Sequence, residues 1–176
     1  MLLDDDKGIY HVLESLKVLD AATFKTVVES TPLVSIDLCL VCEGQLMMGL
    51  RHHEPLKGEW FTPGGRLFKN ERWQDGLARI AKAELGLTVT SDAFQLMGVW
   101  DHFYENSAIN ESVSTHYVNL PHVCYLESYP ELSLDAQHES VRWFDIASIT
   151  KDIGHQIYMR EYASWINENF SAGAGL

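Results

Sequence analysis

The stretch PGGRLFKNERWQDGLARIAKAELGL, residues 63–87, decides the fold of this chain. It opens on a pair of glycines, continues as a charged loop, and then repeats apolar residues at helical spacing. The apolar positions are Trp73, Leu77, Ile80, Ala81 and Leu85. Gly86 follows directly, where a glycine commonly ends a helix in the left-handed conformation. We therefore expect a glycine turn followed by a helix over residues 72–85, packed on one face against a sheet.

The segments on both sides of this stretch predict that sheet. Residues 33–51 show the strand, turn, strand pattern of a hairpin, and three further strands are expected over 93–104, 114–126 and 140–146. Helical spacing appears over residues 5–19, over the segment AATFKTVVES after Asp20, and over about 155–170. The order of these elements predicts an α/β (α+β) fold in which a mixed β-sheet is sandwiched between helices.

The positions of these segments set the expected domain bounds. Residues 1–19 are expected to form an N-terminal helical extension, residues 20–170 a single domain, and residues 171–176 a C-terminal tail. A chain of 176 residues, 46% of them hydrophobic, is of a size that builds one ordinary core. The composition therefore predicts a single domain.

Charge and composition exclude several classes of partner. The formal net charge is −12, which argues against nucleic acid or an anionic membrane as a partner, because both demand basic patches. No apolar run approaches the roughly 18 residues of a membrane helix. The acidic start, MLLDDDKG, differs from a secretory signal and favours a cytoplasmic location. Cys39 and Cys42 lie in an expected strand, where we expect buried, inert thiols that point to opposite faces.

Counted from Gly65, the stretch resembles the Nudix box, G-x5-E-x7-R-E-U-x-E-E-x-G-U, where U is a bulky aliphatic residue. Glu71, Arg79 and Gly86 stand at their box positions, and Glu84 keeps one of the three helix carboxylates. The other two positions hold Ile80 and Ala83. Clustered carboxylates bind several Mg²⁺ ions against a pyrophosphate, and one carboxylate cannot bind such a cluster. Glu84 can still bind a single divalent ion if other oxygen ligands join it.

The flanking segments narrow the resemblance. TVVESTPLVSIDL, GVWDHFYE, THYV and DAQHESVRW are similar to the GDP-mannose mannosyl hydrolase branch of the Nudix family, over roughly residues 23–168. The resemblance implies a hydrolase that cleaves GDP-mannose or a related GDP-hexose, such as GDP-glucose. The implied reaction breaks the sugar C1–O bond with inversion and gives GDP and the free sugar. It implies one Mg²⁺ (or Mn²⁺) ion per subunit and a homodimer.

The resemblance also implies a role for particular residues. The implied metal ligands are the carbonyl of Gly64, the carboxylate of Glu84 and the side-chain oxygen of Gln137. The implied general base is His138, which deprotonates the attacking water. The implied contacts to the leaving diphosphate are Arg51 and Arg66, and the implied lining of the sugar and phosphate region is Asp37, His102 and Tyr117.

Several residues carry a second interpretation. Arg79 is a candidate for substrate binding, or it braces the box loop through an ion pair with Glu71 or Asp75. We expect His138 in a polar loop, and we expect one of His102 and Tyr104 in the core and the other in the site. The run His52-His53-Glu54 is interpreted as a surface loop rather than a metal site.

Two features depart from the family pattern. Val141 stands three residues beyond His138, where the family commonly has a tyrosine, so contacts made through that hydroxyl are missing. The extension over residues 1–19 has no counterpart in the family; it either packs at the dimer interface or is loose.

Two other functions stay open at this point. A conventional Nudix pyrophosphohydrolase would cut a nucleotide sugar between phosphorus and oxygen. A non-catalytic sensor built on the same scaffold would bind a nucleotide sugar without turning it over.

Overall fold

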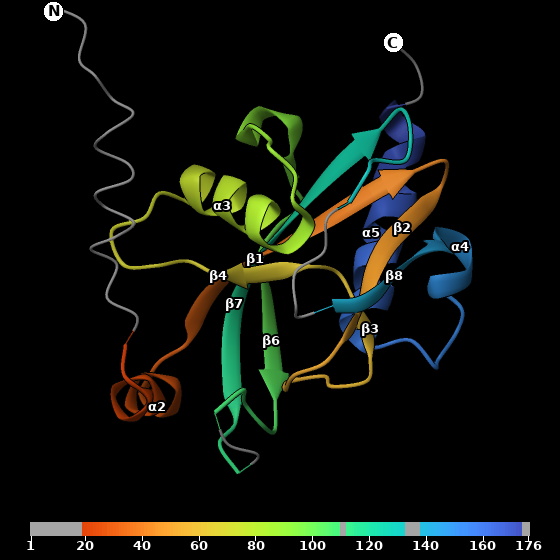
Figure 1. Ribbon diagram of the computed structural model, residues 1–176. Helices are drawn as coiled ribbons and strands as arrows, with labels where there is room; N and C mark the ends of the chain where they lie inside the picture. Colours follow the sequence, from red (N-terminus) through yellow and green to blue (C-terminus); the bar gives the residue numbers. More distant parts are fainter. Residues whose placement is uncertain (1–18, 110–111, 133–137, 174–176) are drawn as a thin grey trace, which may run out of the picture.

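The computed structural model describes residues 19–109, 112–132 and 138–173 (Figure 1). At residues 138–139 and 170–173 only the backbone is described. The expected extension over residues 1–19 therefore lies outside the described residues, apart from Leu19. Within the described ranges, each helix is too short or too polar to cross a bilayer.

The eight strands found in the described ranges form one mixed sheet. Their bounds are β1 (Leu33–Cys42), β2 (Gln45–Arg51), β3 (Trp60–Phe61), β4 (Gly64–Arg66), β5 (Gln95–Leu96), β6 (Trp100–Tyr104), β7 (Thr115–Leu126) and β8 (His138–Asp145). The order is β3-β2-β1-β7-β5, with β4 on β1, β6 on β7 and β8 on β2. The central pair, β1 and β7, runs parallel from Leu33↔Tyr117 to Cys42↔Leu126, and the other pairs are antiparallel.

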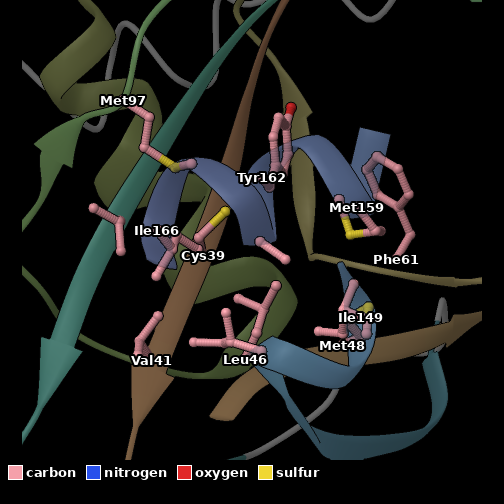
Figure 2. Packing of buried hydrophobic residues seen from close by; sticks show 13 residues of the cluster. Cys39, Val41, Leu46, Met48, Phe61, Met97, Ile149, Met159, Tyr162 and Ile166 are labelled. Carbon is pink, nitrogen blue, oxygen red and sulfur yellow. The ribbon is translucent and has the colours of Figure 1, made fainter. Parts of the chain in front are cut away.

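Helices cover both faces of this sheet. Helix α3 (Trp73–Leu85) packs on the face that carries Ile36 and Leu38, and α5 (Ile157–Gly173) packs on the face that carries Cys39 and Val41 (Figure 1). The faces differ because successive strand residues point in opposite directions. Figure 2 shows the cluster beneath α5. The expected fold, a mixed sheet between helices, is confirmed.

Local signals account for the helix ends. Helix α3 begins one residue later than expected and ends at Gly86, whose φ of 71° is the left-handed conformation of a helix C-cap. Helix α2 (Ala21–Ser30) begins where the carboxylate of Asp20 accepts hydrogen bonds from the backbone amides of Ala22 and Thr23, both at 3.0 Å. Both helices thus start or stop at residues whose chemistry is visible in the sequence.

The structure corrects several expected boundaries. The expected single strand over 93–104 is broken into a 3₁₀ turn (Ser91–Ala93), β5 and β6, and the two strands are separated around Gly98. A Cβ atom on Gly98 would lie 2.8 Å from the ring of Trp100, so the close approach of that ring needs a glycine there. Strand β8 begins at His138, which therefore lies on a strand and not in a polar loop. The short strands β3 and β4, helix α4 (Ile146–Ile149) and the extension of α5 to Gly173 were not expected.

The cysteines agree with their expectation. Cys39, Cys42 and Cys124 are free and buried. Burial raises the pKa of the Cys39 thiol, which lies in the cluster beneath α5. Cys124 belongs to the cluster beneath α3. We expect thiols in such surroundings to be unreactive.

Candidate active site

Polar side chains from three adjacent strands gather on the α5 face of the sheet. They are Ser35 and Asp37 of β1, His102 and Tyr104 of β6, and Tyr117 and Asn119 of β7. The register places Ser35 beside Asn119 and His102 beside Tyr117. These side chains line an inner pocket of about 90 Å³. The pocket corrects one expectation, because His102 and Tyr104 are two residues apart, share a face, and both line it.

A buried hydrogen-bond network forms the floor of the inner pocket. Oδ2 of Asp37 accepts from Nδ2 of Asn119 at 2.7 Å and from the hydroxyl of Tyr162 at 2.9 Å. The same hydroxyl lies 3.1 Å from Nε2 of His102. Tyr162 has a single hydroxyl proton and gives it to Asp37, so Nε2 of His102 donates to the Tyr162 oxygen. Nδ1 of His102 then accepts, from Nδ2 of Asn119 at 3.4 Å and from the hydroxyl of Tyr104 at 3.3 Å.

Burial shifts the pKa values of both titratable groups in this network. Desolvation raises the pKa of the Asp37 carboxyl to about 7, against the opposing effects of Tyr162, Asn119 and Arg51. Desolvation lowers the pKa of His102 to about 4, and Asp101 opposes that shift. His102 also stacks on the ring of Tyr158, with centroids 3.8 Å apart. A neutral imidazole therefore lies beside a carboxyl group that titrates near neutral pH.

The inner pocket opens into a larger outer cleft of about 760 Å³, which lies in the size range of small-molecule sites. The two hollows share the residues Arg51, Pro55, Gly64, Gly65, Arg66 and Tyr117, so they form one continuous site. Arg51 is oriented by a hydrogen bond from its Nε to the carbonyl of Pro55 at 2.9 Å. The guanidinium of Arg66 lies 3.9 Å from the centroid of the Phe24 ring. Two arginines at the junction make this region locally positive in a chain of net charge −12.

The box loop is braced by Arg79 and Glu71. Nε of Arg79 lies 2.6 Å from Oε1 of Glu71, and a terminal nitrogen donates to Oε2 at 2.9 Å and to the carbonyl of Arg66 at 2.8 Å. Oε2 of Glu71 also accepts from the amide of Phe68 at 2.9 Å. The expected ion pair is thus confirmed with Glu71 and not with Asp75. Because Arg79 lines the outer cleft as well, its role in substrate binding stays a prediction.

Of the two carboxylates that the box retains, Glu84 lines the outer cleft, and Glu71 is bonded to Arg79. Glu84, only 7% exposed, lines the outer cleft together with Gly64. The carboxylate of Glu71 is occupied by Arg79, and Ile80 is a core residue 1% exposed. Across the part of the chain that the structure describes, no group of three or more His, Cys, Asp or Glu residues could hold a metal. His52, His53 and Glu54 lie in the loop that borders the outer cleft, as expected for a surface loop.

The structure describes only the backbone of His138 and does not describe Gln137, two residues to which the resemblance assigns a role. Gln137 lies outside the described residues. The backbone of His138 begins β8 and pairs with Arg51 of β2, which brings that position to the edge of the outer cleft. Val141, where the family commonly has a tyrosine, pairs with Gly49 and packs against the cluster beneath α3.

Sequence reasoning missed the residues that complete the inner pocket. Helical spacing over about 155–170 predicts only that Tyr162 lies on a helix, because the partners of its hydroxyl come from distant strands. Asn119 carried a visible signal, as a polar residue in the apolar run YVNLPHV. Ser35 carried none, since a small hydroxyl residue is common in any strand.

Comparisons with known proteins agree with this fold. The NUDIX domain family matches residues 32–166. The low-salt glycan biosynthesis protein Agl8 of Haloferax volcanii is 38% identical over 122 residues, which cover 69% of this chain and 76% of that protein.

Two solved structures share the fold at low sequence identity. The MutT protein of Methanosarcina mazei Go1 superposes with a TM-score of 0.64 at 18% identity, covering 80% of this chain and 97% of that chain. The NUDIX domain of Shewanella oneidensis NrtR, in a complex with ADP ribose, gives a TM-score of 0.62 at 14% identity and covers 90% and 97% of the two chains.

Proposed function

This chain belongs to the Nudix family, and from that premise we propose that it hydrolyses GDP-mannose or a related GDP-hexose, such as GDP-glucose. The proposed reaction breaks the sugar C1–O bond with inversion and releases GDP and the free hexose. The observation that carries the proposal is the loss of two of the three helix carboxylates of the Nudix box. Glu84 is the helix carboxylate that lines the cleft, while Ile80, at one of the lost positions, is buried in the core. A single carboxylate suits the binding of a diphosphate leaving group better than metal-cluster attack on phosphorus.

The chemistry at an anomeric carbon sets what the residues must do. The transition state resembles an oxocarbenium ion, and the reaction needs an activated water and a stabilised leaving group. In the proposed step the water oxygen bonds to C1 and its proton passes to the imidazole of His138. The C1–O bond breaks, and its electron pair leaves on the β-phosphate oxygen of GDP. Arg51 and Arg66 lie where the inner pocket meets the outer cleft and would stabilise that negative charge.

Nudix hydrolases generally use divalent ions, and the donor set here fits one. Glu84 and the carbonyl of Gly64 would bind one Mg²⁺ or Mn²⁺ ion per subunit, with Gln137 as the third protein ligand. When bound, the ion neutralises charge on the diphosphate. The basic junction formed by Arg51 and Arg66 then adds the remaining positive charge that a chain of net charge −12 needs to bind an anion.

The relative supports a sugar nucleotide as the substrate class. Agl8 is named for glycan biosynthesis, a process that draws on activated sugars. We further propose a homodimer and a cytoplasmic location. Large apolar side chains are exposed on the strands, among them Val34 at 42%, Leu96 at 48% and Phe103 at 63%, and a subunit interface would bury such groups. Light scattering of the purified chain tests the dimer, and a monomer at micromolar concentration would refute it.

Hydrolysis in ¹⁸O-labelled water tests the reaction. A panel of GDP-, ADP- and UDP-hexoses is followed by anomer-resolved NMR, which reports the substrate, the bond and the stereochemistry together. Label in the free sugar, with inverted configuration, is expected. Label in a phosphate product would instead indicate a conventional pyrophosphohydrolase.

The His138→Gln variant tests the base and separates the enzyme from a sensor. We expect turnover to fall about 10²–10⁴-fold while GDP binding is kept, because a general base typically contributes that factor. Turnover like that of the parent would show that His138 is not the base. Binding of a nucleotide sugar without turnover by the parent, at saturating Mg²⁺, would favour a sensor.

A further inference from the structure

Two polar atoms on the wall of the inner pocket are buried and have no hydrogen-bond partner among the described residues. They are Oγ of Ser35 and Oδ1 of Asn119, whose residues are 6% and 3% exposed. The two residues are register partners on β1 and β7, so their side chains stand side by side on one face. Buried polar atoms are nearly always paired in folded proteins, so a neighbouring pair of unpaired atoms on a pocket wall needs an explanation.

The orientation of Asn119 is fixed by its neighbours. Its amide nitrogen donates to Oδ2 of Asp37 at 2.7 Å and lies 3.4 Å from Nδ1 of His102. Both of these partners require a donor, so the nitrogen must face them and the carbonyl oxygen must be the unpaired atom. Asp37 and His102 are in turn tied together by the hydroxyl of Tyr162. The acceptor on the pocket wall is therefore rigidly placed before any ligand arrives.

The rest of the inner pocket indicates a neutral ligand rich in hydroxyl groups. Phe61, Leu56 and Tyr104 supply apolar and aromatic surface, which suits the C–H face of a sugar ring. In its ionised form, the carboxyl group of Asp37 on the floor would repel a phosphate. The arginines that suit a diphosphate lie at the junction with the outer cleft, and this arrangement leaves the inner pocket for the uncharged end of a nucleotide sugar.

We propose that Oγ of Ser35 and Oδ1 of Asn119 bind hydroxyl groups of the hexosyl part of the substrate, and that this pair sets which hexose the inner pocket accepts. The inference rests on the proposed function for the identity of the substrate as a hexosyl nucleotide. A sugar hydroxyl can donate to the Asn119 oxygen and either donate to or accept from the Ser35 hydroxyl, so both orphan atoms become satisfied in the complex.

The Ser35→Ala variant gives a clean test, because Oγ makes no bond within the described protein that the change would remove. We expect an unchanged or slightly raised Tm. We expect kcat/KM for GDP-mannose to fall about 2- to 10-fold, the usual worth of one neutral hydrogen bond. The kcat/KM values of the parent and the variant are then compared on a series of GDP-mannose analogues, each of which lacks one sugar hydroxyl. With the analogue that lacks the hydroxyl group bound by Ser35, the parent and the variant should show equal kcat/KM, because the hydrogen bond to Oγ is absent in both.

Two further variants test the second acceptor and control for a loss of stability. Asn119→Val removes the second acceptor, the Oδ1 atom. It should change the ratio of kcat/KM values across the same analogues, and such a ratio does not depend on the stability of the variant. Thr62→Val is the matched control: Oγ1 of Thr62 is a buried hydroxyl bonded to the carbonyl of Leu38, away from the pocket lining. It should lower Tm and leave the ratio of kcat/KM values across the analogues unchanged.

Calorimetric binding of GDP-mannose and GDP separates this inference from the proposed function. The measurement uses the His138→Gln variant, in which turnover is slow and GDP binding is kept. Equal affinity of this variant for the two ligands would overturn the hexosyl subsite, whichever bond is cut. The subsite is also overturned if Ser35→Ala and Asn119→Val leave the analogue ratios as they are in the parent. Isotope label in a phosphate product, with the analogue pattern intact, would overturn the proposed reaction and keep the subsite.

Discussion

Gly64 lies so close to Asp37 that a Cβ atom on the glycine would stand 2.3 Å from Oδ1 of the carboxylate. The two residues are register partners on β4 and β1, and the same Cβ would lie 2.6 Å from the carbonyl oxygen of Ile36. The reason for the glycine is therefore steric contact with a neighbouring strand, and not a left-handed backbone conformation. The first glycine of the pair brings the box loop against the buried carboxylate.

Gly64→Ala should destabilise the fold by about 1–3 kcal/mol, because a strand backbone atom blocks the new methyl group and cannot swing aside. Urea unfolding measures the change. Gly154→Ala is the matched control, since its Cβ would meet only the exposed side chain of Asp152, at 3.1 Å. A loss of less than about 0.5 kcal/mol at Gly64 would mean that β4 is free to move away from β1.

Arg79→Lys should cost about 1–3 kcal/mol of folding stability, because lysine cannot reproduce the two-pronged contact with Glu71 and the bond to the carbonyl of Arg66. The pair is mostly buried, with side chains 23% and 5% exposed. Lys25→Ala removes the exposed pair between Lys25 and Glu29 and should cost less than about 0.5 kcal/mol. Equal effects of the two changes in thermal unfolding would show that Arg79 does not brace the box loop.

Asp37 and His102 should impose opposite pH dependences on folding stability. The pKa of His102 is lowered from 6.5 to about 4, so the stability that comes from its neutral form is complete above pH 6.5 and is lost as the pH falls through 4. The pKa of Asp37 is raised from 3.8 to about 7, so the stability that comes from its protonated form is complete below pH 3.8 and is lost as the pH rises through 7. Between about pH 4 and pH 6.5, a rise in pH therefore lowers the stability contributed by Asp37 and raises the stability contributed by His102.

Single variants should separate the two effects. Relative to the parent, Asp37→Asn should gain stability as the pH rises from 4.5 to 6.5, by up to about 1.4 kcal/mol per pH unit. His102→Gln should lose stability relative to the parent over the same range. Urea unfolding in steps of half a pH unit measures both. An NMR titration of His102 with a midpoint near its ordinary pKa would contradict the assignment.

Much of the fold could be predicted because its signals are local. The hairpin of β1 and β2 and the helix ending at Gly86 each depend on residues within a few positions of one another. The short strands β3 and β4 could not be predicted, because they exist through pairing with β2 and β1 and carry almost no pattern of their own. The break between β5 and β6 comes from the packing of Trp100 on Gly98, a contact that periodicity does not show.

The candidate site likewise contains residues that a sequence motif identifies and residues that only long-range contacts bring together. Arg79 and Glu84 are named by the box, and both line the outer cleft in the structure. The inner pocket depends on long-range contacts, since Tyr162 of α5 meets Asp37 of β1 across 125 positions of sequence. Sequence spacing cannot report such a contact, and Asn119 and Tyr162 therefore enter the site only through the structure.

The metal prediction can be tested without any turnover, through the two carboxylates that the box retains. Glu84 lines the outer cleft, whereas both oxygens of Glu71 accept bonds from Arg79. Glu84→Gln should weaken Mn²⁺ binding more than about 100-fold, because loss of a direct ligand exceeds the effect of losing a supporting one. Electron paramagnetic resonance of free Mn²⁺ measures the affinity and the stoichiometry, expected to be one ion per chain in the parent.

Glu59→Gln, a change at an exposed carboxylate that lines neither hollow, should leave Mn²⁺ binding as in the parent. Glu71→Gln should lower Tm through the loss of the Arg79 contact and retain most of the Mn²⁺ affinity. Two or more tightly bound ions in the parent would contradict the single-ion site. That result would favour attack at phosphorus, because a metal cluster is the arrangement that serves pyrophosphate cleavage.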